Sequence, residues 1–141
     1  MHALMIAAAG LLAGRFQFMV RAQATVPVSY DTVYDNCSAS LSTVACSSQL
    51  ESLGYDTFGS LPDFPFIGGA AVVTPYGSGE CGSCWELSYQ GNRITVLAID
   101  YTDQGFNIAE EAFDVLTNGQ AQSLGRLEAV ATQVNISACG L

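Results

Sequence analysis

Five cysteines in a chain of 141 residues constrain this sequence more than any other feature. Two of them form the close pair Cys81-Gly82-Ser83-Cys84, and the other three, Cys37, Cys46 and Cys139, are spread along the chain. Such a set permits a disulfide framework, a redox-active C-x-x-C pair or a metal site. The compartment in which the protein folds decides among these possibilities.

The first 24 residues have the pattern of a secretion signal. The apolar run at residues 3–14 is too short to span a bilayer, and Ala22-Gln23-Ala24 is the small-x-small motif after which signal peptidase cuts. We therefore predict a signal peptide over residues 1–24 and a secreted, extracellular domain over residues 25–141. A domain of this size has a thin core, so disulfides formed in an oxidising compartment are the expected bracing.

The predicted mature domain is strongly acidic. Two basic residues, Arg93 and Arg126, remain against thirteen acidic ones, which gives a net charge of −11, and the chain has no lysine. Such a surface repels phosphates, so we expect neither a nucleic-acid partner nor membrane insertion. The sole histidine, His2, lies in the predicted signal. Its loss excludes Ser-His-Asp and Cys-His catalysis and histidine-containing zinc sites from the mature domain.

Two motif matches are better explained by a turn and by disulfides. Residues 77–82 fit G-x-G-x-x-G, but a dinucleotide-binding loop must open a helix, and the strand-like Trp-Glu-Leu-Ser-Tyr follows here. The same strand argues against a thioredoxin-type pair, because its first cysteine needs a helix N-terminus to lower its pKa. We therefore expect Cys81 and Cys84 each to bond a distant partner, and we expect no metal or other cofactor.

Strands dominate the predicted secondary structure of one domain, which runs from about Val26 to Leu141. We expect strands where β-branched and aromatic residues alternate with polar ones between turn signals, at residues 26–34, 85–89, 94–99 and 129–136. Gly91-Asn92 predicts a hairpin turn between the second and third of these strands.

One helix has clear start and stop signals. Asn107 is a good N-cap with Glu110 at the N3 position, and Gly119 is expected to end the helix. Its buried face is predicted to hold Ile108, Ala112, Val115 and Leu116. A weaker helix is expected over residues 48–53, and the two prolines and paired glycines of residues 62–69 predict a loop.

Short motifs along the whole predicted domain match one known family in order and spacing. They are Val28-Ser29-Tyr30-Asp31, Val44-Ala45-Cys46-Ser47, Phe64-Pro65 with Ile67-Gly68-Gly69, Cys81-Gly82-Ser83-Cys84-Trp85, Gly105-Phe106-Asn107 and Cys139-Gly140-Leu141. On these residues the chain resembles the cerato-platanin family of secreted fungal proteins. The resemblance implies a six-stranded double-psi β-barrel, similar to the N-terminal domain of expansins, with one or more short helices. Periodicity alone predicts only a mostly β fold.

The resemblance also implies two disulfides, Cys46–Cys81 and Cys84–Cys139. Cys37 has no counterpart in the family pattern. We predict that it is buried as a small hydrophobe. The alternatives are an intermolecular disulfide that makes a dimer, or a shuffled pairing with Cys46.

Two N-glycosylation sequons are present, at Asn36 and Asn135. Because Asn135 falls in a predicted strand, we expect poor glycan occupancy there.

The function that the resemblance implies is that of a non-catalytic cell-wall protein. It would bind chitin or N-acetylglucosamine oligomers in a shallow polar groove, loosen wall polysaccharide as expansins do, and act as an elicitor sensed by a host receptor. The implied ligand-binding residues are Thr43, Val44, Ala45, Asp100, Tyr101, Thr102, Asp103, Gln104, Gly105 and Asn107. Asp100 is the central group, because a carboxylate accepts strong hydrogen bonds from sugar hydroxyls and amides. We expect Asp100→Ala to weaken binding and to leave the fold intact.

The loop after Asp100 departs from the family pattern. Where some members carry Ser-Gly-Arg-Gly, this chain has Tyr101-Thr102-Asp103-Gln104. The change removes a cation and adds an acid, and Tyr101 offers a sugar-stacking face in exchange. Trp85 has two interpretations: it packs against the neighbouring disulfide, or its indole stacks on sugar.

Two other function classes stay open. Asp100 and Asp103 are three residues apart and could act as the two carboxylates of a weak glycoside hydrolase. Alternatively, the protein is a surface-active structural protein that self-assembles at interfaces, for which an exposed apolar patch would be the sign. The expected state in dilute solution is a monomer.

Overall fold

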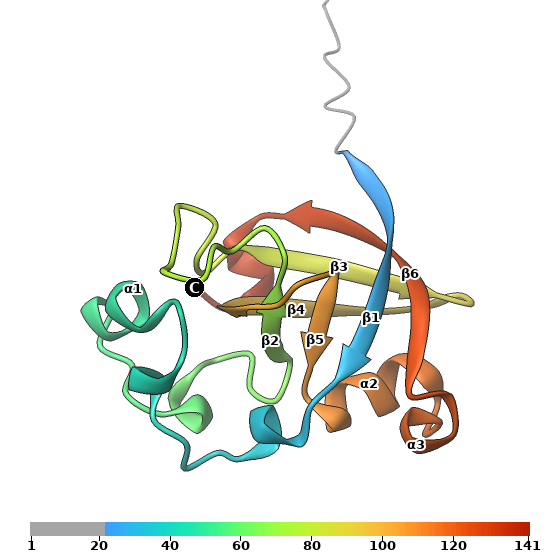
Figure 1. Ribbon diagram of the computed structural model, residues 1–141, viewed down its shortest axis with the longest axis horizontal. Helices are drawn as coiled ribbons and strands as arrows, with labels where there is room; N and C mark the ends of the chain where they lie inside the picture. Colours follow the sequence, from blue (N-terminus) through green and yellow to red (C-terminus); the bar gives the residue numbers. More distant parts are fainter. Residues whose placement is uncertain (1–21) are drawn as a thin grey trace, which may run out of the picture.

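The computed structural model describes residues 22–141, in which six strands close into a barrel in the order β1-β5-β2-β4-β3-β6 (Figure 1). The strands are β1 (Gln23–Tyr30), β2 (Ile67–Ala70), β3 (Cys84–Tyr89), β4 (Asn92–Tyr101), β5 (Phe106–Ile108) and β6 (Arg126–Val134). The predicted signal peptide lies outside the described residues except for its last three, so its boundary stays a prediction. The six-stranded barrel fold is confirmed.

The helices are short and lie outside the barrel wall (Figure 1). They are α1 (Ser47–Ser52), α2 (Glu110–Thr117), α3 (Ala121–Leu124) and the 3-10 turns η1 (Thr32–Asp35), η2 (Leu41–Thr43), η3 (Phe58–Ser60) and η4 (Ile136–Cys139). None of the helices within residues 22–141 is long and apolar enough to cross a membrane.

Alternating side chains fill the barrel. In β6 the inward residues Leu127, Ala129 and Ala131 are buried, whereas Glu128 and Val130 between them are exposed. Strand β4 departs from this alternation, because the run from Val96 to Ile99 is buried on both faces. A strand that other elements cover on its second face needs apolar residues throughout, which explains the continuous run.

Two predicted strands have the wrong ends. The strand expected at residues 26–34 is β1, which ends at Tyr30, because the carboxylate of Asp31 accepts a hydrogen bond from the backbone of Val33 and starts the turn η1. The strand expected at residues 129–136 is β6, which ends at Val134. In both places an Asp or Asn side chain accepts a hydrogen bond from the backbone two residues later, which favours a turn over further strand pairing.

The predicted loop at residues 62–69 contains a strand. Gly68 and Gly69 belong to β2, which pairs with β5 on one side and β4 on the other. A Cβ atom at Gly68 would collide with the backbone carbonyl of Asn107, so the glycine permits two strands to approach closely.

The predicted hairpin between β3 and β4 is present, one residue earlier than expected. Gln90 and Gly91 have the positive φ angles of the two central residues, 46° and 83°. Asn92 already pairs with Tyr89 as part of β4.

Helix α2 exists, but its N-cap is not the predicted one. Asn107 lies in strand β5, and Ala109 at the cap position has no capping side chain. The carboxylate of Asp35, in η1, accepts hydrogen bonds from the backbone N–H groups of Glu110 and Glu111 at 2.8 and 2.9 Å. A residue 75 positions earlier therefore caps the helix. The predicted buried face is wrong at Val115, which is 50% exposed.

The disulfides Cys46–Cys81 and Cys84–Cys139 are both present, with Cα–Cα distances of 5.4 and 5.8 Å. The prediction that Cys37 is buried is wrong. Its thiol is free and exposed, on the turn between η1 and η2. Gly59 packs closely against the Cα and Cβ atoms of Cys37.

The sequon asparagines Asn36 and Asn135 are both exposed. Asn135 does not lie in a strand, as predicted, but begins the turn η4, where its side chain accepts a hydrogen bond from the backbone of Ser137 at 2.9 Å. The structural reason for expecting poor glycan occupancy at Asn135 is therefore removed.

Asp63 is an ionisable side chain in the segment that leads into β2. Its Oδ2 atom is buried and has no hydrogen-bond partner among residues 22–141. Burial raises the pKa of this carboxyl from 3.8 to about 7, because the charged form loses hydration and gains no donor.

The raised pKa predicts a loss of stability with rising pH. The folded state holds the Asp63 proton more tightly than the unfolded state does, so its contribution is complete below pH 3.8 and is lost as the pH rises through about 7. The amide of the variant Asp63→Asn stays neutral at every pH. Relative to this variant, the wild type should lose on the order of 2 kcal/mol of unfolding free energy between pH 4 and 8, a value reduced because solvent screens the half-buried carboxylate. Urea denaturation of both proteins at several pH values measures this, and parallel pH profiles would contradict it.

Candidate functional site

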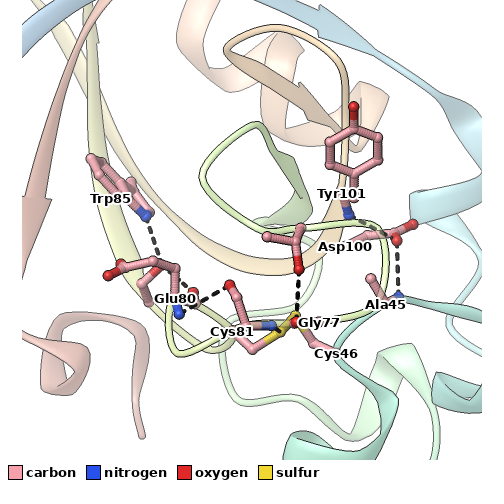
Figure 2. Close-up of a disulfide and its surroundings, with 11 residues drawn as sticks. Ala45, Cys46, Gly77, Glu80, Cys81, Trp85, Asp100 and Tyr101 are labelled. Carbon is pink, nitrogen blue, oxygen red and sulfur yellow. Dashed lines mark hydrogen bonds between the residues drawn. A yellow bond between two sulfur atoms is a disulfide. The ribbon is translucent and has the colours of Figure 1, made fainter.

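Asp100, at the end of β4, is a junction between three parts of the chain. Its Oδ1 accepts hydrogen bonds from the backbone N–H groups of Ala45 and Tyr101 at 3.0 and 2.9 Å, and its Oδ2 accepts one from the hydroxyl of Tyr34 at 2.9 Å. Figure 2 shows the carboxylate facing Ala45, whose neighbour Cys46 is bonded to Cys81. The main role of this side chain is therefore to hold the segment before α1 and the turn η1 against the barrel.

Tyr34 is suited to be a permanent donor in this junction. Its side chain is buried and stacks near Phe58, with ring centroids 6.2 Å apart. Burial, and then the nearby Asp100 carboxylate, raise the pKa of the Tyr34 hydroxyl well above its ordinary range. The hydroxyl keeps its proton at any physiological pH, and the bond to Asp100 persists.

Strand register places Asp100 in a row of small and polar residues. Ser29, Asn107, Gly69 and Asp100 are paired in this order across β1, β5, β2 and β4. We call these four residues the polar row. Ser29 donates a hydrogen bond from its hydroxyl to Asn107 Oδ1 at 3.1 Å. Ser29 and Gly69 were not among the predicted site residues.

The loop after Asp100 closes over the middle of the polar row. A Cβ atom at Gly69 would lie 3.0 Å from the carbonyl oxygen of Tyr101 and 3.3 Å from the Cβ of Thr102. At the far end of this loop, Gly105 packs so tightly on Pro27 that a Cβ atom there would collide with the proline carbonyl. The two glycines therefore fix the loop at both ends.

The tip of this loop carries exposed polar and aromatic groups. The hydroxyl of Tyr101 donates to Asp103 Oδ1 at 2.8 Å, and this hydrogen bond raises the pKa of Tyr101. Arg126 donates to the side-chain carbonyl of Gln104 at 2.9 Å. The ring of Tyr101, the second oxygen of Asp103 and the amide nitrogen of Gln104 stay accessible, so these groups can contact a ligand more freely than Asp100 can.

The remaining predicted site residues have different positions. Ala45 contacts Asp100 directly, as described above. Val44 is buried, and the hydroxyl of Thr43 is exposed and donates to the carbonyl of Ser40 at 2.7 Å. The structure therefore brings together Asp100, Ala45 and the loop, and it places Thr43 and Val44 in a structural turn.

Tyr76 is an exposed aromatic residue near this site that the sequence interpretation missed. Its side chain is 97% exposed, on a turn closed by a hydrogen bond from the hydroxyl of Thr74 to the carbonyl of Gly77 at 2.7 Å. Gly77 packs against the carbonyl of Ala45, so the turn lies beside the Asp100 junction (Figure 2). An aromatic residue within Pro-Tyr-Gly-Ser-Gly was the available signal, because such a turn gives it no core to enter.

Two cavities lie elsewhere on the barrel. The smaller, of about 250 Å³, has an apolar lining that includes Val26, Trp85 and Phe106. Trp85 donates its indole N–H to Ser83 at 2.8 Å, and its ring lies 5.6 Å from that of Phe106. The larger, of about 430 Å³, lies over the turn at Gly79–Ser83. Asp100 lines neither of these two cavities.

Comparison with known proteins places this arrangement in a family. The family model described as Cerato-platanin matches residues 26–141, which is nearly all of the described chain. The chain belongs to the cerato-platanin family. The resemblance seen in the sequence is therefore confirmed.

The relatives of this cerato-platanin include proteins from Coccidioides and Aspergillus. It is 43% identical over 120 residues to the heat-stable 19 kDa antigen of Coccidioides immitis, a match that covers 83% of this chain and 82% of the antigen. It is 46% identical over 116 residues to the allergen Asp f 15 of Aspergillus fumigatus, with 81% and 76% covered.

Solved structures agree with the barrel described above. Cerato-platanin 3 of M. perniciosa superposes with a TM-score of 0.80 at 41% identity, covering 84% of this chain and all of that one. The solution structure of the fungal elicitor Cerato-Platanin gives a TM-score of 0.72 at 34% identity, covering 81% of this chain and 96% of that one.

Proposed function

We propose that this cerato-platanin is a secreted, non-catalytic protein that binds N-acetylglucosamine oligomers of the fungal cell wall. The single observation that carries the proposal is the surface made by the Tyr101–Gln104 loop and the turn of Tyr76 around the Asp100 junction. It offers two exposed aromatic rings beside carboxylate, amide and hydroxyl groups. Sugars are recognised by such a combination of apolar faces and directional hydrogen bonds.

The geometry favours binding over hydrolysis. Glycoside hydrolysis needs a carboxylic acid that can deliver a proton to the leaving oxygen. Both oxygens of Asp100 instead accept hydrogen bonds from three donors that hold the fold together. Because Asp100 is occupied in this way, Asp103 lacks the second carboxyl group that a hydrolase would need. We therefore assign the surface a binding role, with expansin-like loosening of wall polysaccharide as its effect.

Activity as an elicitor belongs to the same proposal. One structural neighbour is described as a fungal elicitor, and relatives are described as an antigen and an allergen. A secreted protein with an exposed, disulfide-braced surface is accessible to a host receptor. The expected state in dilute solution is a monomer.

An NMR titration with N-acetylglucosamine hexamer, and separately with cello-hexaose, tests the binding. We expect backbone shifts clustered on residues 74–78 and 100–107 and no shortened sugar. Tyr76→Ala should weaken binding about 2- to 13-fold, because a stacking face contributes about 0.5–1.5 kcal/mol. Val115→Ala, an exposed change on α2, serves as the matched control and should leave the affinity unchanged.

A surface-active protein is the second candidate. Val72 and Tyr76, which lie close together in sequence, are 44% and 97% exposed. If neither sugar shifts any resonance while the protein lowers the surface tension of water, this alternative replaces the binding proposal. If the titration instead produced shortened sugar, the protein would be a glycoside hydrolase.

A further inference from the structure

The larger cavity has a different lining from the polar row and is built from distant parts of the chain. Its volume of about 430 Å³ is that of a small-molecule site. The lining comes from the segment after α1, the turn before β3, the end of β6 and the residues around η4. Its members are Leu53, Tyr55, Gly79, Glu80, Cys81, Gly82, Ser83, Gln133, Ile136, Gly140 and Leu141.

Both disulfides hold this lining in place. Cys81 is part of the wall and is bonded to Cys46, while Gly140 follows Cys139, which is bonded to Cys84. The turn is fixed further by the N–H of Gly82, which donates to the carbonyl of Ala98 at 2.9 Å. A wall braced in this way is formed before any ligand arrives, so little ordering entropy opposes binding.

The lining combines an apolar rim with one polar pair. Leu53 and Ile136 are 61% and 51% exposed, and the ring of Tyr55 is half-buried between the core and the cavity. The amide nitrogen of Gln133 donates to Glu80 Oε2 at 3.3 Å. This leaves Gln133 Oε1 and Glu80 Oε1 available to accept hydrogen bonds from hydroxyl groups.

The charge of the cavity favours a neutral ligand rich in donors. Within residues 22–141 the basic residues are Arg93 on β4 and Arg126 on β6, which contact Glu86 and Gln104. Neither lines the cavity, and Glu80 is its charged side chain. An anionic ligand would be repelled, whereas sugar hydroxyls would donate to Glu80 and Gln133 and place their C–H faces on Leu53, Tyr55 or Ile136.

The cavity is linked to the surface already described through the turn of Tyr76. Gly79 and Glu80 directly follow the turn of Tyr76, and in Figure 2 the Cys46–Cys81 disulfide lies between Glu80 on one side and Asp100 on the other. A polysaccharide long enough to pass from Tyr76 to Glu80 would contact both the Asp100 surface and the cavity. We propose that this cavity is a second site that takes one pyranose unit of the same neutral polysaccharide. This inference rests on the proposed function.

The test compares a double variant with a matched pair. Gln133→Ala/Ile136→Ala removes one amide and one apolar side chain from the cavity, and Gln122→Ala/Val130→Ala removes one amide and one β-branched apolar side chain at exposed positions outside it. With N-acetylglucosamine hexamer we expect the cavity variant to bind about tenfold more weakly and the control to bind as the wild type does. NMR spectra of both variants without sugar confirm that they are folded.

The resonances that shift separate this inference from the proposed function. Shifts at residues 79–83 and 133–136 as well as at 100–107 support both. Shifts confined to residues 100–107, with unchanged affinity in the cavity variant, overturn the second site and leave the proposed function standing. Shifts confined to the cavity support the second site and overturn the assignment of the Asp100 surface. No shift with the hexamer overturns both.

Discussion

Replacing Cys84 and Cys139 together by alanine is expected to lower the free energy of unfolding by about 4 kcal/mol. The bridge closes a loop of 55 residues and ties the start of β3 to η4. On the chain-entropy model, opening such a loop restores about 4 kcal/mol of conformational freedom to the unfolded chain. Because small domains have only about 5–15 kcal/mol of stability in total, this is a large part of what holds the barrel.

Urea denaturation under non-reducing conditions measures this loss. The control is Cys37→Ala, which removes the exposed thiol that forms no bridge and should change the unfolding free energy by less than about 0.5 kcal/mol. A double variant that unfolds at the same urea concentration as the wild type would show that the Cys84–Cys139 bridge does not stabilise the barrel.

Asp100→Ala is expected to lower the free energy of unfolding by about 3 kcal/mol, which replaces the expectation of an intact fold. The change removes the acceptor of three hydrogen bonds and leaves the N–H of Ala45 and the hydroxyl of Tyr34 without a partner in a partly buried place. Each unsatisfied polar group costs about 1–3 kcal/mol. Loss of sugar binding in this variant would therefore report a disturbed fold as well as a lost contact.

Two single substitutions separate these effects. Tyr34→Phe removes one donor and should cost about 1 kcal/mol. Asp103→Ala, in the exposed loop, should change stability by less than about 0.5 kcal/mol, so any effect on sugar binding would be a direct one. The urea denaturation midpoints of Asp100→Ala, Tyr34→Phe and Asp103→Ala test whether the losses of stability follow this order. Equal midpoints for Asp100→Ala and Asp103→Ala would remove the junction role from Asp100.

The sequence predicts the fold best where a local pattern decides the structure. The alternation along β6 and the dense apolar run of β4 follow from which face each residue buries, and both strands were found. The N-cap of α2 could not be predicted, because Asp35 is 75 residues from the helix that it caps. Strand β2 could not be predicted for the same reason. Its glycines form a strand only because β5 approaches closely, and no local pattern in the sequence indicates that contact.

In the candidate site, too, some features could be predicted from the sequence and others depend on distant contacts. The position of Asp100 and its loop followed from the family resemblance, and the structure places Ala45 beside it. The structural role of Asp100 as a hydrogen-bond acceptor could not be predicted, because its partners Tyr34 and Ala45 lie 66 and 55 residues away in sequence. Tyr76 was missed because an aromatic residue is ordinarily taken for core, although its place within Pro-Tyr-Gly-Ser-Gly indicated an exposed turn.

The placement of the two arginines within residues 22–141 bears on how quickly proteases degrade the folded protein. Trypsin-like proteases cut after lysine or arginine, and within residues 22–141 these are Arg93 in β4 and Arg126 in β6, both held in paired strands of the closed barrel. A protease needs several residues of unpaired backbone, so cleavage must wait until a strand detaches. Digestion by such enzymes is then limited by the opening of the barrel, which the two disulfides oppose.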